Sequence, residues 1–143
     1  ISLTDVSTIL EIKKASLYNH FTSRDDIYNA TLEYCQNEIL NATFISDSVK
    51  ESAKSSKANA EVIFKKLVTQ YFKLYESEPF FKMYAFIFSE QYFNRQAMEI
   101  ASAEYKRICD ETKILLKIFF DAGTIKAEEK DLKDIEKENM PLL

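Results

Sequence analysis

The chain has 143 residues, of which 46% are hydrophobic and 29% are charged, and its formal net charge is −4. One glycine and two prolines supply few of the turn residues that strands and hairpins need, so we expect an all-α protein with a substantial core. No apolar run approaches the roughly 20 residues that span a membrane, which predicts a soluble chain with no membrane partner.

The first thirty residues predict two short helices, a tight turn between them, and the start of a third helix. Ser2 and Asp5 have the spacing of a capping box, which predicts a helix from about Leu3. Apolar residues then recur at helical spacing and form one buried face: Leu3, Val6, Ile9 and Leu10. The turn is predicted near Glu11.

A second short helix follows the turn. Leu17 and Phe21 lie four residues apart and face inward, while the residues between them point mostly outward. Ser23 and Asp26 repeat the capping-box spacing and predict the start of the third helix. Two short helices joined by a turn, with polar residues exposed on the second, are typical of a helix-turn-helix that reads DNA.

This segment resembles the DNA-binding domain of the tetracycline-repressor (TetR) family of bacterial transcription regulators. The matching residues are Ser2, Asp5, Val6, Ile12, Lys14, Ala15, Ser16, Leu17, Tyr18, Asn19, His20, Phe21, Ser23, Arg24, Asp25, Asp26 and Ile27. The resemblance implies a helix-turn-helix domain joined by a long helix to a helical body that binds a small-molecule effector and forms a homodimer. It also implies a ligand-responsive regulator, usually a repressor, on a palindromic double-stranded DNA operator.

The chain departs from the family pattern in three places. Leu10 and Glu11 stand where the family has a small residue and glycine, so Glu11 is expected near the left-handed region at a cost of roughly 1 kcal/mol. The family has a helix before this segment, whereas this sequence starts at Ile1. The family also ends in two long dimerisation helices that the region after Phe120 does not match. We therefore expect the sequence to be a piece of a longer protein.

Eight residues are the predicted DNA contacts: Lys13, Lys14, Ala15, Ser16, Tyr18, Asn19, His20 and Arg24. By resemblance and side-chain chemistry, Lys14, Tyr18 and Arg24 contact phosphates, whereas Ala15, Ser16, Asn19 and His20 approach base edges. Packing inside the protein is the alternative for Tyr18 and His20. Residues 1–30 carry three basic and four acidic side chains, so the segment is nearly neutral and its basic residues act through their clustering.

Beyond this segment the pattern stays helical. The predicted elements are a connecting helix over about residues 23–44, a loop over 46–59, an amphipathic helix over 60–75, a helix from Pro79 to about Phe93, and a helix over 101–119 ended by Gly123. These elements predict a DNA-binding region with its connecting helix over 1–44, and an effector-binding and dimerisation region over 45–143.

Residues 64–93 contain eleven aromatic rings, more than one helix face can use. They form either an ordinary core buried on several sides or the wall of a ligand cavity between helices. The resemblance favours the cavity and a small hydrophobic or aromatic effector. The predicted effector-binding residues are Tyr71, Tyr75, Phe80, Tyr84, Phe88 and Tyr92.

The sequence gives no pattern for catalysis, a metal or a cofactor. His20 is the only histidine, and no spacing typical of a metal ligand set or a phosphate loop is present. Cys35 and Cys109 are expected to be small buried thiols, reduced in a cytoplasmic protein. Residues 124–139 mix both charges and predict a solvated helix or tail. The alternative function is a helical ligand-binding or assembly module of the same fold without DNA recognition.

Overall fold

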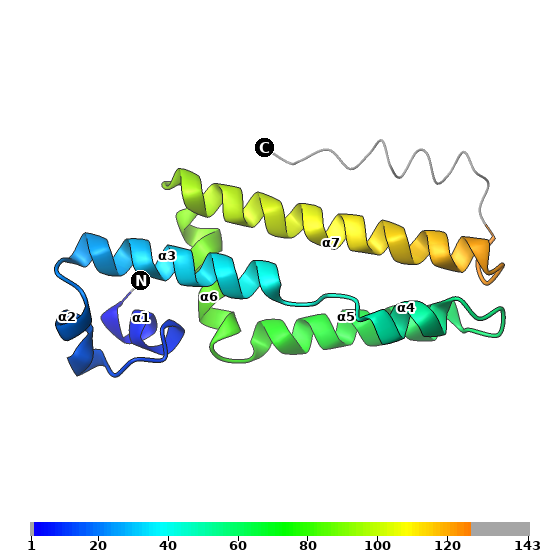
Figure 1. Cartoon of the computed structure of the whole chain (residues 1–143), viewed down its shortest axis with the longest axis horizontal. Helices are drawn as coiled ribbons and strands as arrows, with labels where there is room; N and C mark the ends of the chain where they lie inside the picture. The colour runs from blue at the N-terminus through cyan, green and yellow to red at the C-terminus, as the bar shows by residue number, and fades with distance from the viewer. Residues whose placement is uncertain (1, 127–143) are drawn as a thin grey trace. The chain divides into compact units, whose positions relative to one another are not determined.

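Every regular element in residues 2–126, the range that the computed structural model describes, is helical (Figure 1). In chain order the elements are α1 (Leu3–Ile9), the 3₁₀ helix η1 (Lys14–Ser16), α2 (Leu17–His20), α3 (Arg24–Asn41), α4 (Asp47–Ala53), α5 (Ala60–Glu76), α6 (Phe80–Glu90) and α7 (Arg95–Asp121). The predicted all-α class is therefore confirmed. Within the same range, no helix combines the length and apolar character needed to cross a membrane.

The chain folds into two compact units, each made from two stretches of sequence. The first unit joins the residues up to Ala42 with Lys73–Ala103, and the second joins Thr43–Phe72 with the described residues from Glu104 onward. Helices α5 and α7 each contribute to both units. The predicted boundary between residues 44 and 45 divides a DNA-binding region from an effector-binding region, and it does not coincide with the division into compact units. It stays a prediction.

The larger core of the first unit forms where α6 packs against α1, α3 and the start of α7. Its buried residues are Ile9, Leu32, Cys35, Ile39, Met83, Tyr84, Phe86, Ile87, Ala97, Ile100 and Ala101. Four of them come from adjacent turns of α6, each at most 2% exposed, and form one broad face of the helix. Phe81 on the other side is 52% exposed, so the prediction that this helix is buried on several sides is wrong for the described residues. Burial raises the pKa of the Cys35 thiol to about 12.

The second unit has a smaller core. Its buried residues are Ile45, Ala53, Leu67, Leu115 and Phe119. They come from α4, α5, α7 and the segment after α3. Two apolar residues of the predicted amphipathic helix lie at the surface of α5, because Phe64 and Phe72 are 41% and 59% exposed.

The structure corrects one predicted element, shortens two, and extends the helix predicted over 101–119, which begins at Arg95. Residues 47–53 form α4 rather than a loop, because the Ser46 hydroxyl accepts a hydrogen bond from the Val49 backbone N–H at 3.3 Å and caps the helix. The connecting helix ends at Asn41, since Ala42 is extended. Helix α6 ends at Glu90.

Two further predictions concern the end of α7 and the charged segment that follows it. The last described helix ends as expected near Gly123, which has φ of +75° while Thr124 donates back to the Phe119 carbonyl at 3.0 Å. The predicted charged helix or tail over residues 124–139 lies almost wholly outside the described residues.

Candidate nucleic-acid interface

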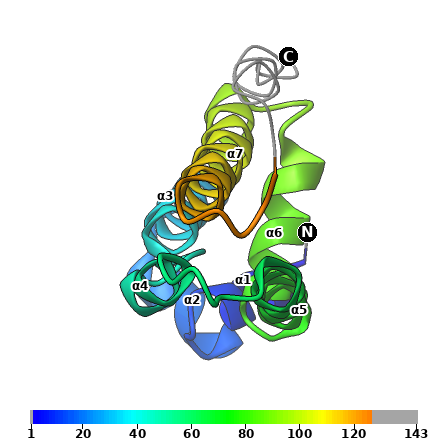
Figure 2. The same ribbon diagram turned by 90° about the vertical axis from the view of Figure 1, so that its right-hand side faces the viewer.

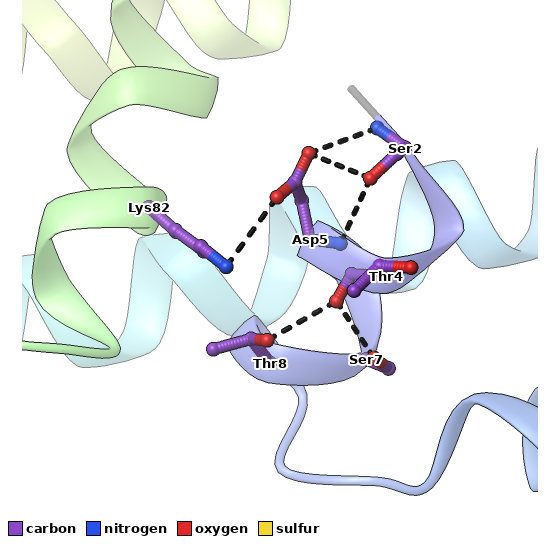
Figure 3. A network of polar contacts seen from close by, with 6 residues as sticks. All are labelled: Ser2, Thr4, Asp5, Ser7, Thr8 and Lys82. Carbon is purple, nitrogen blue, oxygen red and sulfur yellow. Dashed lines mark hydrogen bonds and ion pairs between the residues drawn. The ribbon is translucent and has the colours of Figure 1, made fainter.

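The entry into α1 is fixed by the predicted capping box. The Asp5 backbone N–H donates to the Ser2 hydroxyl at 3.1 Å, and the Asp5 carboxylate accepts from the Ser2 backbone N–H at 3.1 Å and from its hydroxyl at 2.7 Å. Figure 3 shows the other carboxylate oxygen of Asp5 facing Lys82 of α6, 3.4 Å from its ammonium. Hydrogen bonds from Ser2, and then Lys82, hold the pKa of Asp5 below its ordinary value. Asp5 is therefore committed to positioning α1.

Helix α1 ends in a tight turn that reverses at Glu11. Glu11 has φ of 55°, the left-handed conformation that the family resemblance implies at this position. Its N–H donates to the Thr8 carbonyl at 3.3 Å, and the Ile12 N–H donates to the Ser7 carbonyl at 3.0 Å. These two bonds form a Schellman motif, which satisfies two of the carbonyls that a helix end leaves free. The motif sets where the chain restarts.

The next residues form η1 and α2 around one inward anchor. Leu17 is fully buried with Val6 and Ile27, and Phe21 packs against them. Because a single apolar side chain faces inward between Lys13 and His20, the remaining side chains of η1 and α2 are left for the surface. Residues 13–24, which include η1 and α2, form the reading segment.

Seven of the eight predicted DNA contacts are exposed, and Ser16 is half-buried. Tyr18 is 60% exposed, so it does not pack inside this chain, and His20 is exposed as well. The packing alternative for these two side chains is therefore wrong for the described residues.

The three basic side chains of the reading segment have no acidic partner in residues 2–126. Lys13, Lys14 and Arg24 are exposed and form none of the ion pairs that the structure contains. Asp26 accepts a hydrogen bond from the Thr22 hydroxyl, while its backbone N–H donates to Ser23 at 3.1 Å. The second predicted capping box therefore forms only its bond from the Asp26 backbone to Ser23. The Asp26 carboxylate accepts from the Thr22 hydroxyl instead of from the Ser23 backbone.

Helix α3, which continues from the reading segment, is attached to α6 by Tyr28. The Tyr28 hydroxyl donates to Glu90 at 2.8 Å, and its ring meets the Phe86 ring edge-on at 5.6 Å between centroids. Partial burial, with the Glu90 carboxylate adding to it, raises the pKa of Tyr28 to about 12. No local pattern indicates Lys82 or Glu90, because their partners Asp5 and Tyr28 lie more than sixty residues away in the chain.

The predicted effector residues are only partly brought together. Tyr75 and Tyr84 are stacked with ring centroids 3.9 Å apart, and Phe88 and Phe80 lie against them at 5.9 Å and 6.4 Å from Tyr84. Tyr71 belongs to the second unit, where it meets Phe44, and Tyr92 lies beyond the end of α6 and is 79% exposed.

Two cavities of the described residues are lined by other side chains. One of about 380 Å³ lies between α4 and α5, and one of about 40 Å³ lies beside Arg24 and Tyr28. Neither is lined by any of the six predicted effector residues, and residues 2–126 gather no three His, Cys, Asp or Glu side chains that could hold a metal ion.

Comparison of the chain with protein-family models, with curated proteins and with solved structures finds no match. The family resemblance therefore depends on the residues of the first two short helices and the start of α3, and functional inference depends on the chemistry of the sites described above.

Proposed function

We propose that this chain is a transcription regulator that binds double-stranded DNA through its reading segment. The observation that carries the proposal is the mostly exposed run over residues 13–20, anchored by one buried leucine and bearing two lysines that have no acidic partner among the described residues. The resemblance of residues 2–27 to the TetR family supports the same function. A short helix held by a tight turn after another helix suits the major groove, which admits one α-helix.

The contacts follow from the chemistry of the exposed side chains. Lys14, Tyr18 and Arg24 would contact phosphate oxygens and set the register, since an ammonium, a hydroxyl and a guanidinium all donate. Asn19 would read a base edge, because its amide offers a donor and an acceptor together. Ser16, half-buried beside Leu17, would sit at the edge of this surface.

The proposal includes a homodimer and a twofold-symmetric operator. One reading helix covers only a few base pairs, and two related by a twofold axis reach successive major grooves about 34 Å apart. Phe81 and Phe93 are 52% and 87% exposed, and such rings are favoured at interfaces. Light scattering of the full-length protein across micromolar concentrations should give twice the monomer mass; a monomer throughout would remove the dimer.

The proposal also includes control by a small hydrophobic effector bound among Tyr75, Tyr84 and Phe88. The stacked rings would have to separate to admit it, and α6 carries the residues that hold α1 and α3. An effector that weakens operator binding tenfold must itself be bound tenfold more weakly on DNA, a coupling of about 1.4 kcal/mol. Titrations with and without operator measure both affinities, and equal values would show that no coupling exists.

A second candidate is a helical ligand-binding or assembly module without DNA recognition. It is favoured by acidic residues on either side of the reading segment, because Glu11 and Asp25 are exposed and would repel phosphates. Selection of bound genomic DNA fragments by the full-length protein separates the two candidates. A regulator should enrich one recurring sequence with twofold symmetry, whereas fragments without a common sequence would favour the module.

A further inference from the structure

A cleft of about 380 Å³ opens between α4 and the first half of α5 in the second unit. Figure 2 shows these two helices next to each other in end-on view. The residues that line the cleft are Ser46, Ser48, Val49, Ser52, Ile63, Lys66, Leu67 and Gln70. The sequence pattern predicted a loop over half of this wall, so the cleft is a feature that the structure adds.

The wall of the cleft combines an apolar part with a polar part. Val49, Ile63 and Leu67 belong to the core of the second unit or pack against it, and Leu67 is only 5% exposed. At the start of α4 the Ser46 and Ser48 hydroxyl oxygens lie 3.0 Å apart and share a hydrogen bond, while the Ser52 hydroxyl donates to the Ser48 carbonyl at 3.0 Å. A ligand lying here would meet hydrocarbon on one side and hydrogen-bonding groups on the other.

Among the described residues that line this cleft, Lys66 is the one cation. The neighbouring lysines are paired: Lys65 lies 2.8 Å from Glu61, Lys54 lies 2.6 Å from Glu51, and Lys50 lies 3.2 Å from Glu111 of α7. In residues 2–126 Lys66 has no carboxylate partner, and the Gln70 amide one turn further along α5 has no hydrogen-bond partner. Residues 46–70 contain five lysines and three acidic residues in a chain of net charge −4, so the local field favours an anion.

The size of the cleft limits what it can hold. A volume of 380 Å³ corresponds to roughly a dozen water molecules at about 30 Å³ each, near the lower end of small-molecule pockets. A helix or a nucleic acid strand does not fit such a volume, whereas one small molecule does.

We propose that this cleft binds a small monocarboxylate with a short hydrocarbon body. The carboxylate lies beside the Lys66 ammonium and accepts hydrogen bonds from the Gln70 amide and from the one hydroxyl of the Ser46–Ser48 pair that does not donate within the pair. The hydrocarbon lies on Val49, Ile63 and Leu67. This site requires neither DNA binding nor the ring cluster of α6, so it stands apart from the proposed function.

Hexanoate and hexanamide are matched probes, because they have the same number of heavy atoms and only hexanoate carries a charge. Titration of the full chain, followed by NMR of its backbone amides, should show saturable shifts that centre on residues 46–70. Hexanamide should bind about fivefold more weakly, since an exposed ion pair is worth up to about 1 kcal/mol. Equal affinities for the two probes, or no saturable shift with hexanoate, would overturn the proposal.

Two adjacent lysines give a matched pair of variants. Lys66→Gln should weaken hexanoate binding about fivefold and leave hexanamide binding unchanged, again because one exposed charge is removed. Lys65→Gln is the control, since Lys65 is paired with Glu61 and does not line the cleft. Equal effects of the two variants on hexanoate would overturn the site. The titration contains no DNA, so its failure leaves the proposed DNA binding standing, and failure of DNA binding leaves this site standing.

Discussion

The two compact units differ in how fully their helices are buried and in how they are joined internally. In the first unit α6 buries one broad face in a cluster of eleven buried residues, and polar side chains connect it to α1 through Asp5 and to α3 through Tyr28. In the second unit five buried residues form the core, and α5 leaves a polar-lined cleft beside α4. The first unit is therefore suited to hold the reading segment in a fixed geometry, and the second to receive a ligand.

Two leucine truncations give the largest expected effects and test this difference directly. Leu32→Ala in the first unit should lower the free energy of unfolding by about 4 kcal/mol, because a fully buried site leaves a closed cavity. Leu67→Ala should cost about 2 to 3 kcal/mol, since Leu67 borders the open cleft and the lost volume joins it. Urea unfolding of each variant measures both values. A loss in free energy of unfolding for Leu67→Ala that equals or exceeds the loss for Leu32→Ala would contradict the difference between the two cores.

Removing the hydroxyl that ties α3 to α6 should have an intermediate effect. Tyr28→Phe deletes the donor to Glu90 and leaves that half-buried carboxylate without its partner, which should cost about 1 to 2 kcal/mol at pH 7. Tyr18→Phe is the matched control, because Tyr18 is 60% exposed and should change stability by less than about 0.5 kcal/mol. Similar losses in the two variants would mean that the hydrogen bond from Tyr28 to Glu90 contributes nothing to the free energy of unfolding.

The same hydroxyl predicts a dependence on high pH. The pKa of Tyr28 is raised from 10.0 to about 12, so the folded state keeps a proton that the unfolded state loses between these values. Its contribution to stability is complete below pH 10 and disappears as the pH rises through 12. The stability difference between the parent and Tyr28→Phe should therefore shrink across this window. A difference that stays constant from pH 9 to 12 would contradict the raised pKa.

The smallest expected effect has the opposite sign. Glu11→Gly should raise the stability of the first unit by about 0.5 to 1 kcal/mol, because glycine adopts φ of 55° without the strain of a Cβ atom. Glu33→Gly in the interior of α3 is the control and should lower stability by about 1 kcal/mol. Thermal melts of the two variants measure both signs, and destabilisation by Glu11→Gly would show that this side chain is needed for another contact.

The parts of the fold with local causes could be predicted from the sequence. The Ser2–Asp5 box, the left-handed Glu11 and the inward Leu17 all depend on residues a few positions apart. Helix α4 was missed because seven residues are too few to show a helical period, although Ser46 is a normal N-cap. Lys82 and Glu90 were missed because a bond between distant residues leaves no trace in a single sequence.

The candidate sites show the same limit. The exposed run of the reading segment follows from the position of Leu17, whereas the ring cluster could be predicted only as a group of aromatic residues. Which rings meet depends on the path of the chain, so Tyr75 stacks on Tyr84 while Tyr71 packs in the other unit. The α4–α5 cleft depends on the same path and became visible only in the structure.

The salt dependence of operator affinity is the most direct test of whether the reading segment binds DNA. Affinity for a selected operator fragment should be measured over a series of salt concentrations for the parent, Lys14→Ala, Asn19→Ala and the exposed-lysine control Lys57→Ala. Lys14→Ala should weaken binding to all sequences and flatten the salt slope by about one unit, because one phosphate contact is lost. Asn19→Ala should change the preference among sequences, and Lys57→Ala should behave as the parent. Equal affinities and equal salt slopes for the parent and Lys14→Ala would contradict the account.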